Sequence, residues 1–178
     1  YPGTCRQLGR VESDARKASG APFALRLDMA AAIGRAGPLT WHDQTRGTIT
    51  AEPNQFGDAV VARKDVPTSY HLSVTVDDHL QGVTLVTRGV DLFEATHLHR
   101  LLQALLGFGP PRYAHHPLLM GRDGKRLAKR DHPATLRAMR NAGVKADDLR
   151  AALASGDSER LHTLIDVAEG ATDANHRP

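Results

Sequence analysis

Four cationic side chains lie close together in this chain, where they could bind a polyphosphate. They fall within the six residues after Gly124, and they are Lys125, Arg126, Lys129 and Arg130. The largely apolar run 116–120 directly upstream predicts a strand, and α/β sheets bind ligands at the carboxyl ends of their strands. Cations at that edge would stabilise the charge that develops on a pyrophosphate leaving group. Since a run of Lys and Arg is usually a solvated surface, its place after a strand is what favours a nucleotide site.

Arg88 is a candidate for binding a carboxylate. It follows the short apolar run 83–86 and precedes Gly89. Such a run is typical of a buried parallel strand, so the guanidinium would lie at the strand's carboxyl end and could bind a carboxylate in a bidentate manner. Tyr70 is the second candidate in this region. Because a single Tyr or Arg is usually structural, the position of Arg88 after a strand is what indicates a site.

Tyr1 and Cys5 are candidates for a partial zinc site. A spacing of four residues puts two side chains on one side of a helical turn. A zinc ion takes about four ligands, so these two residues cannot complete a site by themselves. A lone cysteine is by itself an ordinary small residue more often than a ligand.

The histidines do not predict a metal site. His97 and His99 are two residues apart on a predicted helix, so they point to different faces. His115 and His116 are adjacent on a predicted strand and also point to opposite faces. We therefore expect solvated or core histidines at all four positions.

The elements that must position these side chains differ between the first and the second half of the chain. Residues 7–19 predict a surface helix, and residues 23–64 are rich in predicted β structure. Alternation and turn residues place four strands there, at 23–27, 39–41, 47–51 and 59–62. Alternation alone would make 70–78 a strand as well.

The second half of the chain predicts an α/β arrangement. Asp91 caps an amphipathic helix that runs to Leu106, between predicted strands at 83–86 and 113–120. Strand, helix and strand with such connections predict half of a doubly wound parallel sheet. Further helices are predicted from Pro133 to Gly143, at 147–154 and at 158–168, and the polar residues 170–178 predict a frayed tail.

Composition limits the class of protein. The chain has 178 residues, a net charge of +3 and an isoelectric point near 9.3, which are compatible with an RNA partner but do not require one. Its single cysteine allows no internal disulfide, so we expect a reducing cytosol. No apolar run approaches the roughly 20 residues of a membrane helix. The start is neither an initiator methionine nor a signal peptide, so we expect an N-terminal part before Tyr1.

Several motifs together resemble the glutamyl-type class I aminoacyl-tRNA synthetases. The stretch 126–130, Arg-Leu-Ala-Lys-Arg, is similar to the Lys-Leu-Ser-Lys-Arg form of the class signature, with Arg126 in place of the first lysine and Ala128 in place of the serine. The Pro-Leu-Leu of 117–119 matches the strand that leads into it. Four short segments, 69–72, 76–78, 82–84 and 86–89, together also resemble one continuous block of the family. The resemblance covers about residues 1–140.

The resemblance implies a fold and a set of site residues. The fold would be the second half of a Rossmann-type parallel sheet, followed by a small helical region that contacts the tRNA stem. Tyr70 and Arg88 would hold L-glutamate, and Lys129 would contact ATP, helped by Lys125, Arg126 and Arg130. The family also makes 70–80 a helix, which we prefer to a strand because Asp77-Asp78-His79 is a poor strand end.

The resemblance also implies a division of the chain. Residues 1–56 would be the end of a zinc insertion with a connecting β-rich segment, and 57–112 the second half of the Rossmann domain. Residues 113–169 would hold the signature loop and the stem-contact helices, and 170–178 a disordered tail.

The early end of the chain resembles that of the glutamyl-Q tRNA(Asp) synthetases. These short members of the family activate glutamate with ATP and transfer it to the queuosine base in the anticodon of tRNA(Asp). The string Tyr1-x-Gly-x-Cys5 resembles the end of their zinc insertion, so Zn²⁺ is expected only with ligands from an N-terminal part. That part would also carry the loop that binds adenosine. These residues alone are therefore predicted to be inactive, and we expect a cytoplasmic monomer.

Two alternatives remain open from the sequence. The chain could be part of a glutamyl-tRNA synthetase that charges the 3′ end of tRNA(Glu). It could also be a non-catalytic RNA-binding module that kept the synthetase fold, because fold alone does not fix function.

Overall fold

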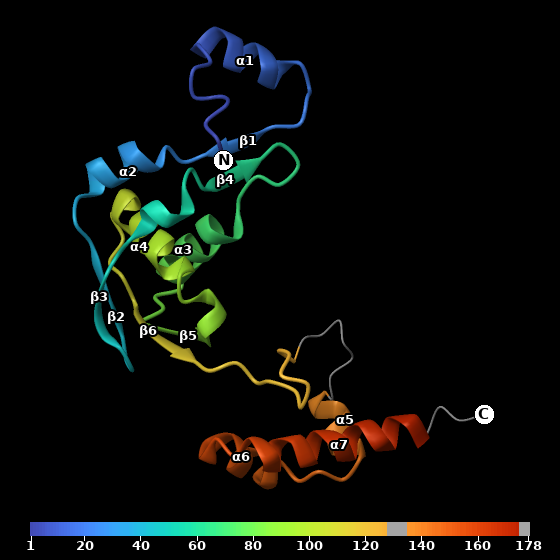
Figure 1. Ribbon diagram of the computed structural model, residues 1–178. Helices are drawn as coiled ribbons and strands as arrows, with labels where there is room; N and C mark the ends of the chain where they lie inside the picture. The colour runs from blue at the N-terminus through green and yellow to red at the C-terminus, as the bar shows by residue number, and fades with distance from the viewer. Residues whose placement is uncertain (128–134, 175–178) are drawn as a thin grey trace. The chain divides into compact units, whose positions relative to one another are not determined.

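The computed structural model describes residues 1–127 and 135–174, and the chain divides into two compact units. The first comprises residues 1–117 and the second residues 118–178. Each unit is coloured by residue number in Figure 1, and each has its own hydrophobic core.

The first unit contains a four-stranded sheet. Its strands are β2 (Thr40–Asp43), β3 (Gly47–Thr50), β5 (Leu85–Gly89) and β6 (Arg112–His116), in the order β3-β2-β6-β5. Strand β6 pairs in parallel with both β5 and β2, whereas β2 and β3 form an antiparallel hairpin. The predicted α/β class with a parallel sheet is confirmed. Because β6 is a central strand, Tyr113 and His115 on it are buried.

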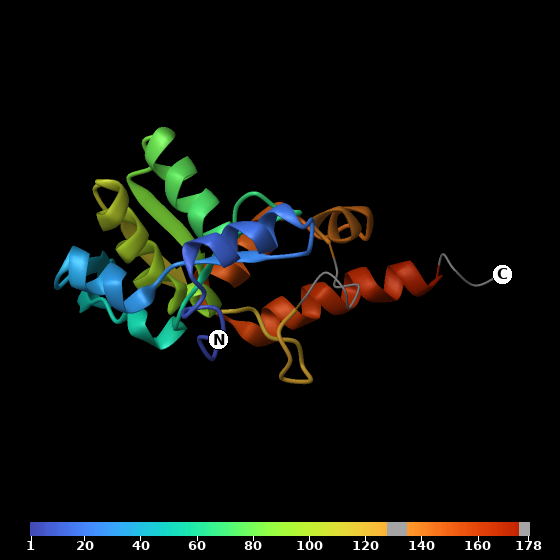
Figure 2. The ribbon, with the colours of Figure 1, turned by 90° about the horizontal axis from the view of Figure 1, so that it is seen from above.

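Three helices pack together in this unit: α2 (Met29–Ala36), α3 (Tyr70–Leu80) and α4 (Ala95–Leu106). Helix α4 packs against both α2 and α3, which Figure 2 shows from above. It also contacts the sheet, since Gln103 donates to the Tyr113 hydroxyl and Arg100 donates to the Thr40 carbonyl. Burial of Leu98, Leu101 and Leu102 of α4 with Met29 and Ala32 of α2 provides the apolar contact that stabilises the unit.

Residues 70–80 form a helix, as the family resemblance implied, and the alternation reading of a strand is wrong. The Ser69 side chain caps α3 by accepting a hydrogen bond from the Leu72 amide. Thr75 is the most buried residue of α3. Packing along α4 therefore decided the conformation of a sequence whose local pattern was ambiguous.

The start of α4 differs from the prediction. Asp91 lies in a single 3₁₀ turn, η2 (Val90–Leu92), and α4 begins only at Ala95. Glu94 occupies the N-cap position, and its side chain makes no capping hydrogen bond. The predicted cap at Asp91 is therefore wrong, because the 3₁₀ turn separates it from the helix.

A second, two-stranded sheet pairs β1 (Ala24–Arg26) with β4 (Val60–Arg63). All three residues of β1 are exposed, so the predicted half-buried alternation is wrong for this strand. Before it, α1 (Arg10–Ala18) buries no residue, as expected of a surface helix. A 3₁₀ turn, η1 (Pro53–Phe56), connects the hairpin to β4.

The second unit is helical. Its helices are α5 (Leu136–Asn141), α6 (Ala146–Ser155) and α7 (Ser158–Ala174), and both α5 and α6 pack against α7 (Figure 1). Helix α5 is capped by Thr135, and the predicted helix start at Pro133 lies outside the described residues. Helix α7 continues to Ala174, beyond the predicted end at 168, so residues 170–174 of the predicted tail are helical.

The division at residues 56 and 112 stays a prediction. The four-stranded sheet takes residues from all three predicted segments, since β2 lies in 1–56, β5 lies in 57–112, and β6 begins at Arg112 and continues into 113–169. Strand β6 also ends at His116 and not at Met120. Pro117 follows it and has no N–H to donate to the sheet. No helix in the described part of the chain is long and apolar enough to span a membrane.

Candidate active site

Arg88, at the carboxyl end of β5, is held by three neutral acceptors. Its Nη2 donates to Thr96 Oγ1 at 2.5 Å, its Nε to His115 Nε2 at 3.1 Å, and its Nη1 to His99 Nδ1 at 3.2 Å. A guanidinium has five N–H groups, so one donor on Nη1 and one on Nη2 remain beyond these bonds. A carboxylate binds to such a pair in a bidentate manner.

His115 links Arg88 to a buried carboxylate. Because an arginine can only donate, His115 Nε2 must accept, and the proton must sit on Nδ1, which donates to Asp43 Oδ2 at 2.7 Å. The imidazole is therefore neutral, and burial lowers its pKa although Asp43 opposes this. Burial would raise the pKa of Asp43, but hydrogen bonds from Thr45 and His115 outweigh it and hold that pKa well below its ordinary value.

His99 and His71 form a second chain of hydrogen bonds from Arg88. His99 is 2% exposed, and its Nε2 lies 2.9 Å from His71 Nδ1. Burial, together with the positive charge of Arg88, lowers the pKa of His99 to about 3. Burial and Arg88 also lower the pKa of His71. Both imidazoles are therefore neutral at physiological pH, and the charge of Arg88 has no anion among its direct partners.

Tyr70 lies beside these histidines at the start of α3. Its ring centroid is 5.5 Å from that of His71 and 6.0 Å from that of His99. Tyr70 and His71 line a cavity of about 520 Å³, which also includes Arg26 and Arg63. Arg88 does not line this cavity, and it reaches Tyr70 only through His99. The structure therefore brings the two predicted glutamate-binding residues to the same histidine.

The spacing of these histidines is visible in the sequence, but spacing within one helix or strand does not show which other elements the side chains contact. His97 and His99 do point to different sides of α4, yet both are buried, because α4 has neighbours on several sides. His97 Nδ1 contacts the Trp41 indole N–H and the Glu52 amide, and His99 contacts Arg88. The expectation of core histidines is thus confirmed for His97, His99 and His115, and two of the three also hold a site residue.

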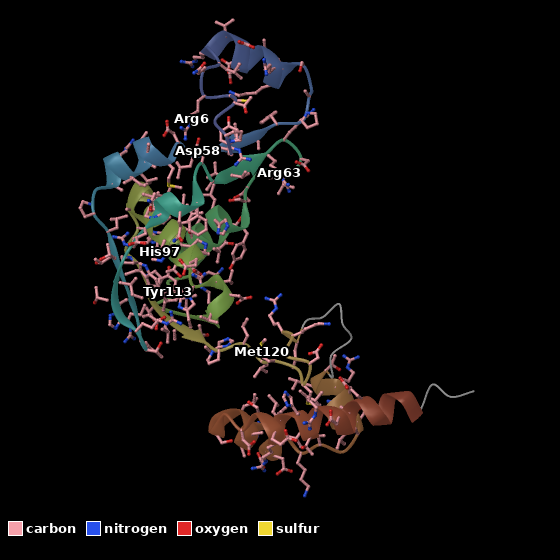
Figure 3. All side chains as sticks on the ribbon, viewed as in Figure 1. Arg6, Asp58, Arg63, His97, Tyr113 and Met120 are labelled. Atoms are coloured by element: carbon pink, nitrogen blue, oxygen red, sulfur yellow. The ribbon has the colours of Figure 1, made fainter. Side chains whose placement is uncertain are left out.

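Tyr1 and Cys5 lie next to each other in the first unit. The Tyr1 hydroxyl accepts a hydrogen bond from the Cys5 amide at 2.7 Å. Arg6 anchors this segment to Asp58, to which its Nε donates at 2.8 Å and its Nη2 at 2.7 Å; both residues are labelled in Figure 3. Cys5 is exposed, so its sulfur is accessible to a metal. Nowhere in the described residues do three or more His, Cys, Asp or Glu side chains gather to hold an ion.

The cationic loop lies in the second unit. Lys125 and Arg126 line a cavity of about 510 Å³ together with residues of α7. The Lys125 side chain is 84% exposed and pairs with Asp123 at 3.6 Å. A bridge between Met120 and Arg126 closes this loop. Lys129 and Arg130 lie outside the described residues, so their predicted contact with ATP stays a prediction.

Arg122, which the sequence analysis did not single out, ties this loop to α7. It donates to Glu159 at 2.9 Å and to Asp166 at 3.1 Å. His162 Nε2 adds a hydrogen bond to the Met120 carbonyl at 2.7 Å; the Met120 side chain is labelled in Figure 3. Glu159 and Asp166 lie about two turns apart on α7, and only the tertiary structure places them against Arg122.

Comparison with known proteins defines the class of this chain. A model of the catalytic domain of class I tRNA synthetases specific for glutamate and glutamine matches residues 1–163. The chain therefore belongs to the class I glutamyl and glutaminyl tRNA synthetase family. A crystal structure of a glutamate tRNA ligase from Elizabethkingia meningosepticum matches 71% of this chain and 24% of that one, with a TM-score of 0.55 and 28% identity.

The chain is also similar to individual proteins of this family. The chain is 45% identical over 155 residues to the glutamyl-Q tRNA(Asp) synthetase of Rhodobacter capsulatus, across 84% of this chain and 54% of that protein. It is 41% identical over 169 residues to that of Symbiobacterium thermophilum, across 95% and 49%. The glutamate–tRNA ligase of Finegoldia magna is 30% identical over 171 residues, across 95% and 34%. The chain thus spans about half the length of the glutamyl-Q relatives that it matches.

Proposed function

We propose that the full-length protein activates L-glutamate with ATP and transfers it to the queuosine base in the anticodon of tRNA(Asp). The observation that carries this proposal is the state of Arg88. Its three hydrogen-bond acceptors are neutral, and two of its donors remain for a substrate carboxylate. The higher identity to glutamyl-Q synthetases than to glutamate–tRNA ligases supports the choice of tRNA.

The reaction has two steps. The glutamate α-carboxylate attacks the α-phosphate of ATP, which forms an acyl-adenylate and releases pyrophosphate. A nucleophile on queuosine then attacks the acyl carbon and releases AMP. The protein acts by positioning and by charge stabilisation.

The residues of this chain take separate roles in that scheme. Arg88 and Tyr70 orient glutamate. Lys129 stabilises the phosphates as a mobile point charge, helped by Lys125, Arg126 and Arg130. Tyr1 and Cys5 supply two ligands for a structural Zn²⁺ whose other ligands come from elsewhere in the full-length protein. Loss of about one equivalent of zinc in a Cys5→Ser variant, measured by elemental analysis, is the expected result for that ligand role.

The test uses the full-length protein. We expect glutamate-dependent exchange between ATP and pyrophosphate, followed by transfer of labelled glutamate to tRNA(Asp) that contains queuosine but not to tRNA(Asp) without it. Charging of tRNA(Glu) would overturn the choice of tRNA. Salt-sensitive RNA binding without any exchange would show a non-catalytic module.

The role of Lys129 has its own test. Lys129→Ala should lower the rate of exchange by a hundredfold or more while the thermal midpoint stays the same, because a lost phosphate contact in the transition state costs about 3 kcal/mol or more. Lys145→Ala is the matched control, since Lys145 is an exposed lysine at the start of α6. Unchanged exchange in the Lys129 variant would refute the assignment.

A further inference from the structure

The hydrogen bonds of Arg88 fix where the proton of His71 must lie. Arg88 Nη1 can only donate, so His99 Nδ1 accepts and the single proton of the neutral His99 sits on Nε2. That proton points along the 2.9 Å contact to His71 Nδ1, which must then accept. The remaining proton of His71 therefore lies on Nε2, on the far side of its ring.

No hydrogen bond joins this Nε2–H to an acceptor among the described residues, and His71 is one of the residues that line the cavity beside Tyr70. The cavity also contains the cations Arg26 and Arg63. The carboxylate in its lining, Asp58, is already bound by Arg6 and by the Met29 amide. A free donor beside two arginines suits an anionic ligand, and a neutral imidazole binds a carboxylate without the cost of burying a second charge next to Arg88.

We propose that His71 is a further glutamate-binding residue, whose Nε2–H donates a hydrogen bond to a carboxylate of the substrate and whose orientation as a donor is set by Arg88 through His99. This inference rests on the proposed function, because it takes glutamate as the ligand of the cavity beside Tyr70. It also requires His71 to stay neutral, since a proton on Nδ1 would leave His99 with two ring nitrogens that must both accept.

Two substitutions in the full-length protein distinguish the roles of the two ring nitrogens of His71. The amide nitrogen of Asn reaches the position of Nδ1, whereas that of Gln reaches the position of Nε2. We expect His71→Asn to raise the KM for glutamate by about ten- to a hundredfold, because a hydrogen bond to a charged group is lost. We expect His71→Gln to remain within about threefold of the wild type. The KM for ATP should change in neither variant.

Equal values of the KM for glutamate in the wild type and in both variants would overturn the proposal. Equal loss in the Asn and Gln variants would also overturn it, because that result indicates a packing role for the ring. Thermal midpoints of all three proteins identify a variant that fails to fold. For such a variant, the NMR measurement below decides the proposal.

NMR of ¹⁵N-labelled histidine provides a readout that does not need activity. We expect the Nε2–H tautomer for His71 and His99 and the Nδ1–H tautomer for His115, without any substrate. Added glutamate should shift the Nε2 resonance of His71 and leave that of His115 in place. An Nδ1–H tautomer of His71, or no shift with saturating glutamate, would refute the proposal.

The two proposals fail in different ways. If the wild type does not exchange pyrophosphate with glutamate, the proposed function fails, whatever the tautomers are. If the wild type does exchange and His71→Asn matches it, the role of His71 fails alone.

Discussion

At the scale of single residues, the site depends on what surrounds one guanidinium. Arg88 is held by Thr96, His99 and His115, and none of these acceptors is charged. Had a carboxylate taken one of these places, the positive charge would be neutralised before a substrate arrived. The neutral acceptors hold the geometry of Arg88 and leave its charge for a ligand.

Thr96 offers a direct test of this arrangement. It is fully buried, and its hydroxyl accepts from Arg88 at 2.5 Å. Thr96→Val keeps the shape and removes the acceptor, so we expect the free energy of unfolding to fall by about 1–3 kcal/mol. We also expect the KM for glutamate to rise in pyrophosphate exchange. Thr96→Ser keeps the hydroxyl and is the control, and equal effects of the two substitutions would contradict the assigned role.

At the scale of elements, α4 carries the ionisable groups that make stability depend on pH. The pKa of His99 is lowered from 6.5 to about 3 in the folded protein. Between these values the unfolded chain binds a proton that the folded protein excludes, so the free energy of unfolding falls as pH falls below 6.5. At pH 5 the loss from His99 alone would reach about 2 kcal/mol. The pKa values of His71 and His115 are also lowered, and they act in the same direction.

Denaturant unfolding of the full-length protein between pH 7.5 and pH 5 checks this expectation. The groups that face His99 are Arg88, His71 and the Tyr70 ring, and the carboxylates Asp43 and Asp58 add their own acid destabilisation only below their ordinary pKa of 3.8. Burial raises the pKa of Asp78, so this carboxyl acts in the opposite direction. A His99→Gln variant cannot titrate at this position and should lose less stability over the same range. Stability that is constant or rises toward pH 5 in the wild type would contradict the prediction.

At the scale of the whole molecule, two hydrophobic cores stabilise two units. Leu101 is fully buried in the first core and Ile165 is 7% exposed in the second. Truncating either side chain leaves a cavity that costs about 2–5 kcal/mol. Because each cavity lies in one core, Leu101→Ala should speed amide hydrogen exchange within 1–117, and Ile165→Ala within 118–174. Mass spectrometry of the full-length variants measures this, and equal acceleration in both units would show a single cooperative core.

Some features of the fold followed from local chemistry. The apolar spacing from Asp91 to Leu106 predicted a helix, the apolar run before Arg88 predicted a parallel strand, and glycine and proline marked the connections between them. Residues 70–80 show the limit of such reasoning. Their alternating pattern fits a strand, and only the Ser69 cap and the packing against α4 make them helical.

The sequence by itself determined the class of this chain, because the cationic signature and the block around Arg88 are short contiguous motifs that can be read without a fold. It also placed Arg88 at the end of a strand. Only the tertiary structure decided what surrounds that arginine. Thr96 and His99 come from α4 and His115 from β6, and these side chains meet Arg88 only because β6 pairs with β5 and α4 packs against α3. A hydrogen bond between distant residues depends on that packing, and no local periodicity records it.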